Sequence, residues 1–218
     1  MTSNDKSPII HYSPLSDIVY NWIRDAILNS EFKPGERLSQ EMITTRLQVS
    51  RTPVRDAFKR LQTEGLLEIR PNAGAIVTRL SAEKLAEIYE LRTLLEGPAA
   101  RYACQNITDQ DIDHLAEINQ HMILNRDDPN EFIKGNRAFH TALYGYSKRD
   151  YLVNYIFQLW DLIEPYRIMY ISKKGKVEGS IQEHLEVISA LTQRDEAETE
   201  RVIVEHLKKV VTTLSIPD

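Results

Sequence analysis

Apolar residues recur at three- and four-residue spacing from Ser81 almost to the end of the 218-residue chain, without an alternating strand pattern. This spacing gives each helix one apolar stripe, which is buried against other helices. Polar breaks divide this part into six segments: 81–104, 108–125, 129–146, 150–171, 180–193 and 195–214. The pattern predicts an all-α antiparallel bundle of six or seven helices in residues 80–218.

Two of these segments carry helix start signals. Ser180 and Glu183 have the spacing of a capping box, in which each side chain bonds the backbone of the other. Asp195 precedes the last segment as an N-cap candidate. The sequence therefore predicts a loop over 172–179, followed by helices that begin near 180 and 195.

Residues 1–79 have a different organisation, with short helical segments before short strands. Helical spacing covers three segments: 16–29, 39–47 and 50–64. Two strand-like segments follow, on either side of a turn that ends at Gly74: 66–70 and 75–79. Three short helices and a two-stranded wing predict a winged helix-turn-helix, so the fold class of the whole chain is mainly α.

The third helical segment separates apolar from basic residues. Its apolar positions predict an inward face: Val54, Ala57, Phe58 and Leu61. The first turn of a recognition helix reaches base edges, where an arginine can donate two hydrogen bonds to guanine. Small hydroxyl residues and amides at the helix start suit a phosphate. The candidate DNA contacts are Ser50, Arg51, Thr52, Arg55 and Lys59, and the alternative is an ordinary solvated basic face.

The two parts also differ in charge, although the net charge of the chain is −5. Residues 1–79 hold 11 Lys and Arg against 9 Asp and Glu, whereas residues 80–218 hold 16 against 23. A short basic stripe on an otherwise acidic protein is compatible with a small DNA-binding module attached to another domain.

The stretch 34–77 resembles the N-terminal domain of the GntR family of bacterial transcription regulators. The matching residues are PGERL at 34–38, VSRTPVR at 49–55, Leu61, EGL at 64–66 and Gly74. The resemblance implies base contacts for Arg51 and Arg55 and a minor-groove approach for Gly74. Ala73 stands where relatives often carry an arginine, so no minor-groove arginine is implied at that position.

Three histidines lie on apolar helix faces: His140, His184 and His206. A single histidine in such a place is more often a hydrogen-bonded core residue, but three from different helices can share a site. Imidazole nitrogens bind Zn, Ni, Fe and Mn, and Asn136 lies one helical turn before His140. Spacing alone leaves both interpretations open, a metal site and core residues.

The second half resembles the FCD effector domain of the FadR subgroup of that family. The matching residues are YELRTLLE at 89–96, NRAFH at 136–140, EH at 183–184, DEA at 195–197 and HL at 206–207. Many members hold a divalent metal, which commonly takes the carboxylate of a small organic acid. The resemblance implies Asn136, His140, His184 and His206 as metal ligands. Asn136 is neutral where many relatives have aspartate.

An anionic effector needs polar contacts besides a metal. The guanidinium of Arg92 matches a carboxylate in geometry, although Arg92 could instead pair with Glu96 or face solvent. Tyr144, Tyr166 and Arg167 are further candidate contacts.

These features predict a bacterial transcription regulator, with repression as the commoner arrangement in the family. It would bind double-stranded operator DNA as a homodimer and respond to a small carboxylate in the helical domain. A second possibility is a regulator with a structural metal or none, and an effector such as an acyl-CoA. A metal-dependent hydrolase is a third, but the chain has no HExxH motif and no evident general base beside the histidines, so we expect no enzyme.

The remaining signals concern the compartment. The single cysteine, Cys104, cannot form an internal disulfide. The N-terminus is polar, and no apolar run approaches the ~18–20 residues of a membrane span. We therefore expect a cytoplasmic protein without membrane partners.

Overall fold

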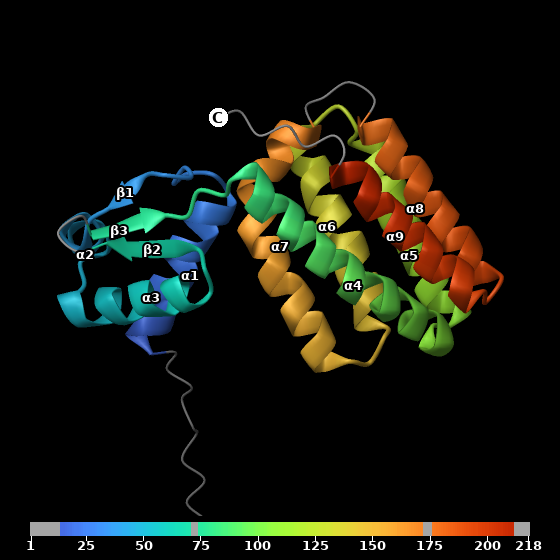
Figure 1. The fold of residues 1–218 in the computed structure, drawn as a ribbon, viewed down its shortest axis with the longest axis horizontal. Helices are drawn as coiled ribbons and strands as arrows, with labels where there is room; N and C mark the ends of the chain where they lie inside the picture. Colours follow the sequence, from blue (N-terminus) through green and yellow to red (C-terminus); the bar gives the residue numbers. More distant parts are fainter. Residues whose placement is uncertain (1–13, 71–73, 172–175, 212–218) are drawn as a thin grey trace, which may run out of the picture. The chain divides into compact units, whose positions relative to one another are not determined.

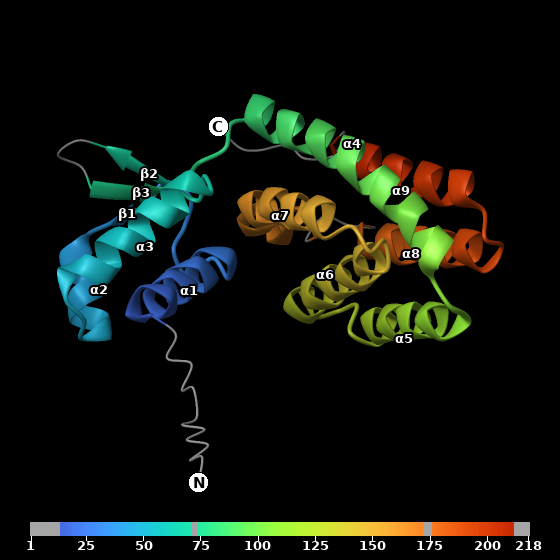
Figure 2. The same cartoon turned by 90° about the horizontal axis from the view of Figure 1, so that it is seen from below.

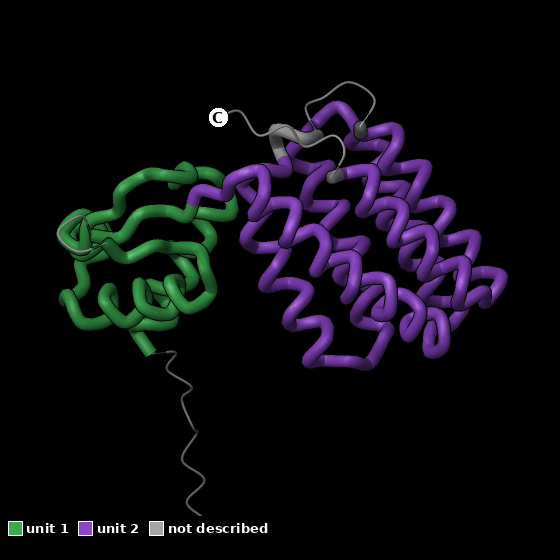
Figure 3. Tube along the Cα trace, viewed as in Figure 1, with its two compact units in different colours: residues 1–78 green, residues 79–218 purple. Residues whose placement is uncertain are grey.

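A computed structural model of the chain describes residues 14–70, 74–171 and 176–211. The chain divides into two compact units, residues 1–78 and 79–218 (Figure 3). None of the helices within the described ranges is long and apolar enough to cross a membrane.

The first unit is the predicted winged helix-turn-helix (Figure 1). Its elements are α1 (Leu15–Leu28), β1 (Arg37–Leu38), α2 (Gln40–Leu47), α3 (Arg51–Thr63), β2 (Leu67–Arg70) and β3 (Gly74–Val77). The sheet is antiparallel with strand order β1-β3-β2. Strand β1 was not predicted, because two residues are too short to show an alternating pattern.

Local chemistry fixes the boundaries of α2 and α3. The Ser39 hydroxyl accepts a hydrogen bond from the Met42 amide at 3.0 Å, which caps α2 as predicted. Ser50 occupies the N-cap position of α3, but its side chain makes no capping hydrogen bond. The chain leaves α3 through Gly65 at φ 79°, a left-handed conformation that glycine adopts without steric cost.

The described part of the second unit contains six helices, in agreement with the predicted bundle (Figure 1). They are α4 (Ala82–Asn106), α5 (Asp109–Leu124), α6 (Pro129–Gly145), α7 (Asp150–Ile171), α8 (Lys176–Thr192) and α9 (Glu196–Val211). Helix α9 packs against α4 and α8, α5 packs against α6 and α8, and α7 packs against α4 and α6 (Figure 2). One hydrophobic core runs through these contacts.

The predicted start of α8 was wrong. The helix begins at Lys176, so Ser180 lies inside it and forms no capping box with Glu183. Val177 packs against the hydrophobic core, which extends the helix by one turn toward its N-terminus. The cap of the last helix is confirmed, because Asp195 Oδ1 accepts from the Glu198 amide at 2.9 Å.

A glycine brings α9 close to α4. A Cβ at Gly97 would lie 2.8 Å from Cγ2 of Val204, closer than two carbon atoms pack. The missing side chain therefore sets the separation of these helices, and α9 carries His206 into the bundle.

Candidate functional site

Helix α3 separates its two faces as the sequence predicts. The inward residues Val54, Ala57, Phe58 and Leu61 are buried. The five candidate contacts on the helix and its cap are exposed: Ser50, Arg51, Thr52, Arg55 and Lys59. The basic side chains are therefore available to a ligand outside the domain.

The wing begins at Gly74, which has a φ of 81°. Two exposed arginines flank it: Arg70 is its partner in the strand register, and Arg37 Nε would lie 3.9 Å from a Cβ at Gly74. Neither arginine was predicted as a contact, and Arg37 comes to the wing only through the pairing of β1 with β3. Ala73 lies outside the described residues.

The three histidines converge in the helical unit. His140, His184 and His206 come from α6, α8 and α9, and all are buried. Each offers one ring nitrogen, and these nitrogens lie within 4.8 Å of one another. Nε2 of His140 and Nε2 of His184 are 3.3 Å apart. Two nitrogens that each lie 2.0–2.1 Å from a tetrahedral zinc are separated by about 3.3 Å, so this pair fits such an ion without rearrangement.

Neighbouring polar groups orient two of these rings. Nδ1 of His206 bonds Oε2 of Glu183 at 2.5 Å, and Nδ1 of His140 bonds the Tyr144 hydroxyl at 3.1 Å. Partners of this kind fix the tautomer and leave Nε2 for a metal. Nδ1 of His184 is buried and has no hydrogen-bond partner among the described residues. The contact of Glu183 with His206 was not predicted, because the sequence indicated a capping box for Glu183.

Burial favours the neutral imidazoles of His140 and His184. It lowers the pKa of His140 well below the usual value, and the neighbouring His184, His206 and two arginines act in the same direction. Burial also lowers the pKa of His184, with His206 and Arg167 as further causes. A neutral imidazole has the lone pair that a metal requires.

Asn136 presents its nitrogen to the cluster. Its Nδ2 lies 3.1 Å from Nε2 of His184, while its Oδ1 accepts a hydrogen bond from Nη2 of Arg167. Because only the oxygen of an amide is a metal ligand, ligation would require this side chain to turn and Arg167 to release it. The assignment of Asn136 as a ligand therefore stays a prediction.

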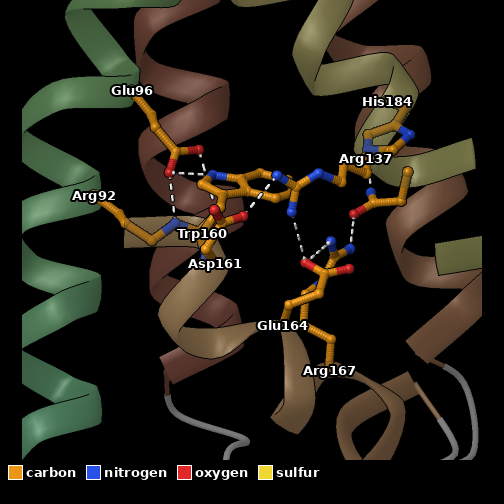
Figure 4. A network of polar contacts seen from close by, with 9 residues as sticks. Arg92, Glu96, Arg137, Trp160, Asp161, Glu164, Arg167 and His184 are labelled. Carbon is orange, nitrogen blue, oxygen red and sulfur yellow. Dashed lines mark hydrogen bonds and ion pairs between the residues drawn. The ribbon is translucent and has the colours of Figure 1, made fainter. Parts of the chain in front are cut away.

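A buried ion pair is linked to the cluster through the Tyr144 hydroxyl, which bonds both His140 and Glu96. Arg92 Nε bonds Oε1 of Glu96 at 2.5 Å, and Glu96 also accepts from Trp160 Nε1 at 2.9 Å and from the Tyr144 hydroxyl at 2.6 Å. Figure 4 shows this pair together with the second group of charges around Glu164. Of the interpretations of Arg92 that the sequence left open, pairing with Glu96 is confirmed.

The second group joins α6 to α7. Glu164 Oε2 accepts from Arg137 at 3.3 Å and from Arg167 at 3.4 Å, and Arg137 also bonds Asp161 at 2.8 Å (Figure 4). Each carboxylate of both groups is thus engaged by an arginine. The candidate ligand set of three histidines contains no carboxylate.

A cavity of about 30 Å³ adjoins the cluster, enough for about two water molecules. Three of the four predicted effector contacts line it, Arg92, Tyr166 and Arg167, and so do Asn136 and His206. Tyr144 does not line it, and its hydroxyl bonds Glu96 and Nδ1 of His140. The hydroxyl of Tyr166 accepts a hydrogen bond from the Leu80 amide at 2.8 Å.

The buried histidines make the stability of the metal-free helical unit sensitive to acid. Both His140 and His184 have folded-state pKa values below the unfolded value of about 6.5, so the unfolded chain binds more protons. Above about pH 6.5 these two histidines do not lower the free energy of unfolding. Below about pH 6.5 each histidine lowers it by up to about 1.4 kcal/mol per pH unit. Urea unfolding between pH 7.5 and 5.5 measures this slope.

A variant pair separates this effect from general acid sensitivity. His140→Gln should reduce the change of the free energy of unfolding with pH by the contribution of one proton, up to about 1.4 kcal/mol per pH unit. His114→Gln, at an exposed position on α5, serves as the control and should leave the slope unchanged. A slope that is the same in all three proteins would contradict the prediction.

Comparison with known proteins gives the family. Residues 15–77 match the family of bacterial regulatory proteins called gntR, and residues 87–209 match the FCD domain. The Nta operon transcriptional regulator of Aminobacter aminovorans is 35% identical over 184 residues, which cover 82% of this chain and 84% of that protein. The HTH-type transcriptional repressor RspR of Escherichia coli is 28% identical, over 90% of this chain and 87% of that protein.

Solved structures agree in fold. The structure of Escherichia coli McbR/YncC superposes with a TM-score of 0.80 at 26% identity, and covers 92% of this chain and 97% of that one. The fold of both units, the winged helix and the helical bundle, thus occurs in a single chain of known structure. The chain belongs to the GntR family of transcriptional regulators, with a C-terminal FCD domain.

Proposed function

We propose that this regulator is a repressor whose affinity for its operator is controlled by a small carboxylate bound to a metal in the FCD domain. One observation carries the proposal: three buried, converging histidine nitrogens lie within 4.8 Å of one another. His140, His184 and His206 would hold a divalent Zn, Ni, Mn or Fe ion. The bound metal would supply a Lewis-acid site for the carboxylate.

The charge of the cluster supports an anionic effector. Three imidazole ligands bring no negative charge to a divalent ion in a buried place, and the carboxylate that bonds His206, Glu183, is also paired with Lys209 at 3.0 Å. The nearby carboxylates of Glu96 and Glu164 are already paired with arginines. An acid would therefore supply the missing charge, and metal and acid would each raise the affinity for the other.

The size of the cavity implies that binding involves movement. A volume of about 30 Å³ holds water but no organic acid. An entering carboxylate would draw Arg92 away from Glu96 or Arg167 away from Asn136. Both arginines line the cavity and would contact the ligand after such an exchange.

At the other end of the mechanism, α3 would read the operator. Arg51 and Arg55 would contact bases from the first turns of the helix, while Ser50, Thr52 and Lys59 would bind phosphates. Gly74 would let the wing approach the minor groove. A homodimer would present two such helices to a palindromic site.

The dimer would use exposed apolar residues of the FCD domain. Leu91 and Leu94 on α4 and Tyr151 and Tyr155 on α7 are exposed, and these two helices pack against each other. Apolar side chains of this size on adjacent helices are typical of a surface that another chain covers. A second copy fits the requirement for two recognition helices.

Arg55→Ala tests the base contact. Loss of a bidentate contact to guanine should weaken binding to an operator, selected from random DNA, by about 1–3 kcal/mol. Binding to non-specific DNA should change far less. Fluorescence anisotropy at fixed salt measures both, with Lys84→Ala on α4 as the control. Equal losses on both DNAs would assign Arg55 to phosphate binding instead.

His184→Ala tests the metal site, and zinc titration calorimetry on protein purified without a metal column is the measurement. Zinc affinity should fall at least about 100-fold, since loss of an outer partner alone costs 10- to 100-fold. His121→Ala, at an exposed position on α5, should bind zinc as the wild type does. Unchanged zinc binding in His184→Ala would contradict the proposal.

The same titration tests the charge argument. Citrate, as a probe carboxylate, should raise the zinc affinity of the wild type. Asn136→Asp adds a negative charge beside His184, so it should raise zinc affinity without citrate at least about tenfold and weaken the citrate effect. An equal citrate effect in both proteins would refute the charge argument while leaving the metal site intact.

Leu94→Glu tests the dimer surface, because it places a charge where an apolar contact is expected. It should raise the dimer dissociation constant at least about tenfold, since each buried leucine contributes roughly 1.5–3 kcal/mol. Leu124→Glu on α5 is the matched control, because Leu124 and Leu94 are 74% and 70% exposed. Sedimentation equilibrium gives the result, and an unaltered dimer in Leu94→Glu would exclude this surface.

A further inference from the structure

The connection between the two units is held by two backbone amides. The Thr78 N–H donates to the Leu66 carbonyl at 3.0 Å, within the winged helix unit. The Leu80 N–H donates to the Tyr166 hydroxyl at 2.8 Å, within the helical unit. Only Arg79, which is exposed, lies between these anchors. A single residue therefore separates the last backbone anchor of the winged helix unit from the first anchor of the helical unit.

The anchor on the helical side belongs to the wall of the cavity. Tyr166 lies on α7, is 7% exposed, and lines the cavity with Arg92 and Arg167. The side chain of Leu80 is 5% exposed and is part of the bundle core, so the linker is fixed at this residue by both packing and hydrogen bonding. A ligand in the cavity would touch the residue that holds the linker.

The hydroxyl of Tyr166 can accept one hydrogen bond and donate another at the same time. A phenol accepts hydrogen bonds through its oxygen and donates one through its own proton. The Leu80 amide uses the oxygen, and no described residue accepts the proton. Burial raises the pKa of Tyr166, so the proton is present at physiological pH. An anion in the cavity is the acceptor that this proton lacks.

We propose that Tyr166 is a positioning residue that couples the cavity to the operator-binding unit through its hydrogen bond to Leu80. This inference rests on the proposed function, because it assumes that an anion enters the cavity. The anion accepts a hydrogen bond from the Tyr166 hydroxyl and draws the hydroxyl toward itself. The Leu80 amide then moves with the hydroxyl or loses its hydrogen bond. Because one residue separates the two anchors, the displacement reaches Thr78 and the wing strand.

Tyr166→Phe removes the hydroxyl and keeps the ring. Tyr146→Phe is the matched control, because Tyr146 is a partly buried tyrosine at the end of α6 that packs against the bundle core and does not line the cavity. Three measurements are made on each full-length protein: hydrogen exchange of the Leu80 amide by NMR, zinc affinity, and operator affinity with and without zinc and citrate.

The inference requires that Leu80 exchange about tenfold faster in Tyr166→Phe than in the wild type. Zinc and citrate should change the operator affinity of the wild type and of Tyr146→Phe at least about fivefold, and that of Tyr166→Phe by less than about twofold. Bound zinc in Tyr166→Phe shows that the lost response is not a lost site. An equal response in Tyr166→Phe would overturn the inference.

A wild type that binds neither zinc nor citrate would refute the proposed function. The positioning role of Tyr166 would then be tested by the Leu80 exchange rate and by the operator affinity without ligands. A changed ligand-free operator affinity in Tyr166→Phe alone would then support the positioning role. Equal affinities in all three proteins, or an unaltered Leu80 exchange rate, would overturn it.

Discussion

The buried carboxylate of Glu96 organises the helical unit. It accepts hydrogen bonds from Arg92 of its own helix, from Tyr144 of α6 and from Trp160 of α7, so three helices meet at one charge. Removing one partner of a buried pair typically costs about 3–5 kcal/mol, because the other charge is left uncompensated. The Tyr144 hydroxyl also bonds Nδ1 of His140, so the orientation of this histidine depends on the same carboxylate.

The elements of the fold could be predicted because their signals are local. Spacing of three and four residues identified every helix of the described bundle, and the apolar face of α3 is buried as expected. The start of α8 could not be predicted in this way. Ser180 and Glu183 carry a genuine capping pattern, but the packing of Val177 against the core extends the helix past it. Tertiary burial outweighed a local signal worth about 1 kcal/mol.

The sequence predicts which histidines belong to the candidate site, but not how the side chains around them are arranged. His140, His184 and His206 stand out because histidine is unusual on an apolar face, and the three do meet. The direction of each side chain is a tertiary property. Sequence spacing does not reveal that Asn136 turns its oxygen to Arg167, or that Glu183 reaches across to α9.

The pairing of the cavity arginines bears on selectivity. Arg92 and Arg167 already bind Glu96 and Glu164, so an incoming carboxylate exchanges one charged partner for another and gains little from either arginine alone. The net gain would come from groups that have no charged partner before binding: the metal and the proton of Tyr166. A ligand that engages only the arginines would gain little free energy from the rearrangement that it requires, and a ligand shifts an equilibrium only by the difference between its affinities for the two states. Control of the operator would therefore depend on reaching both the histidine cluster and the hydroxyl that holds the linker.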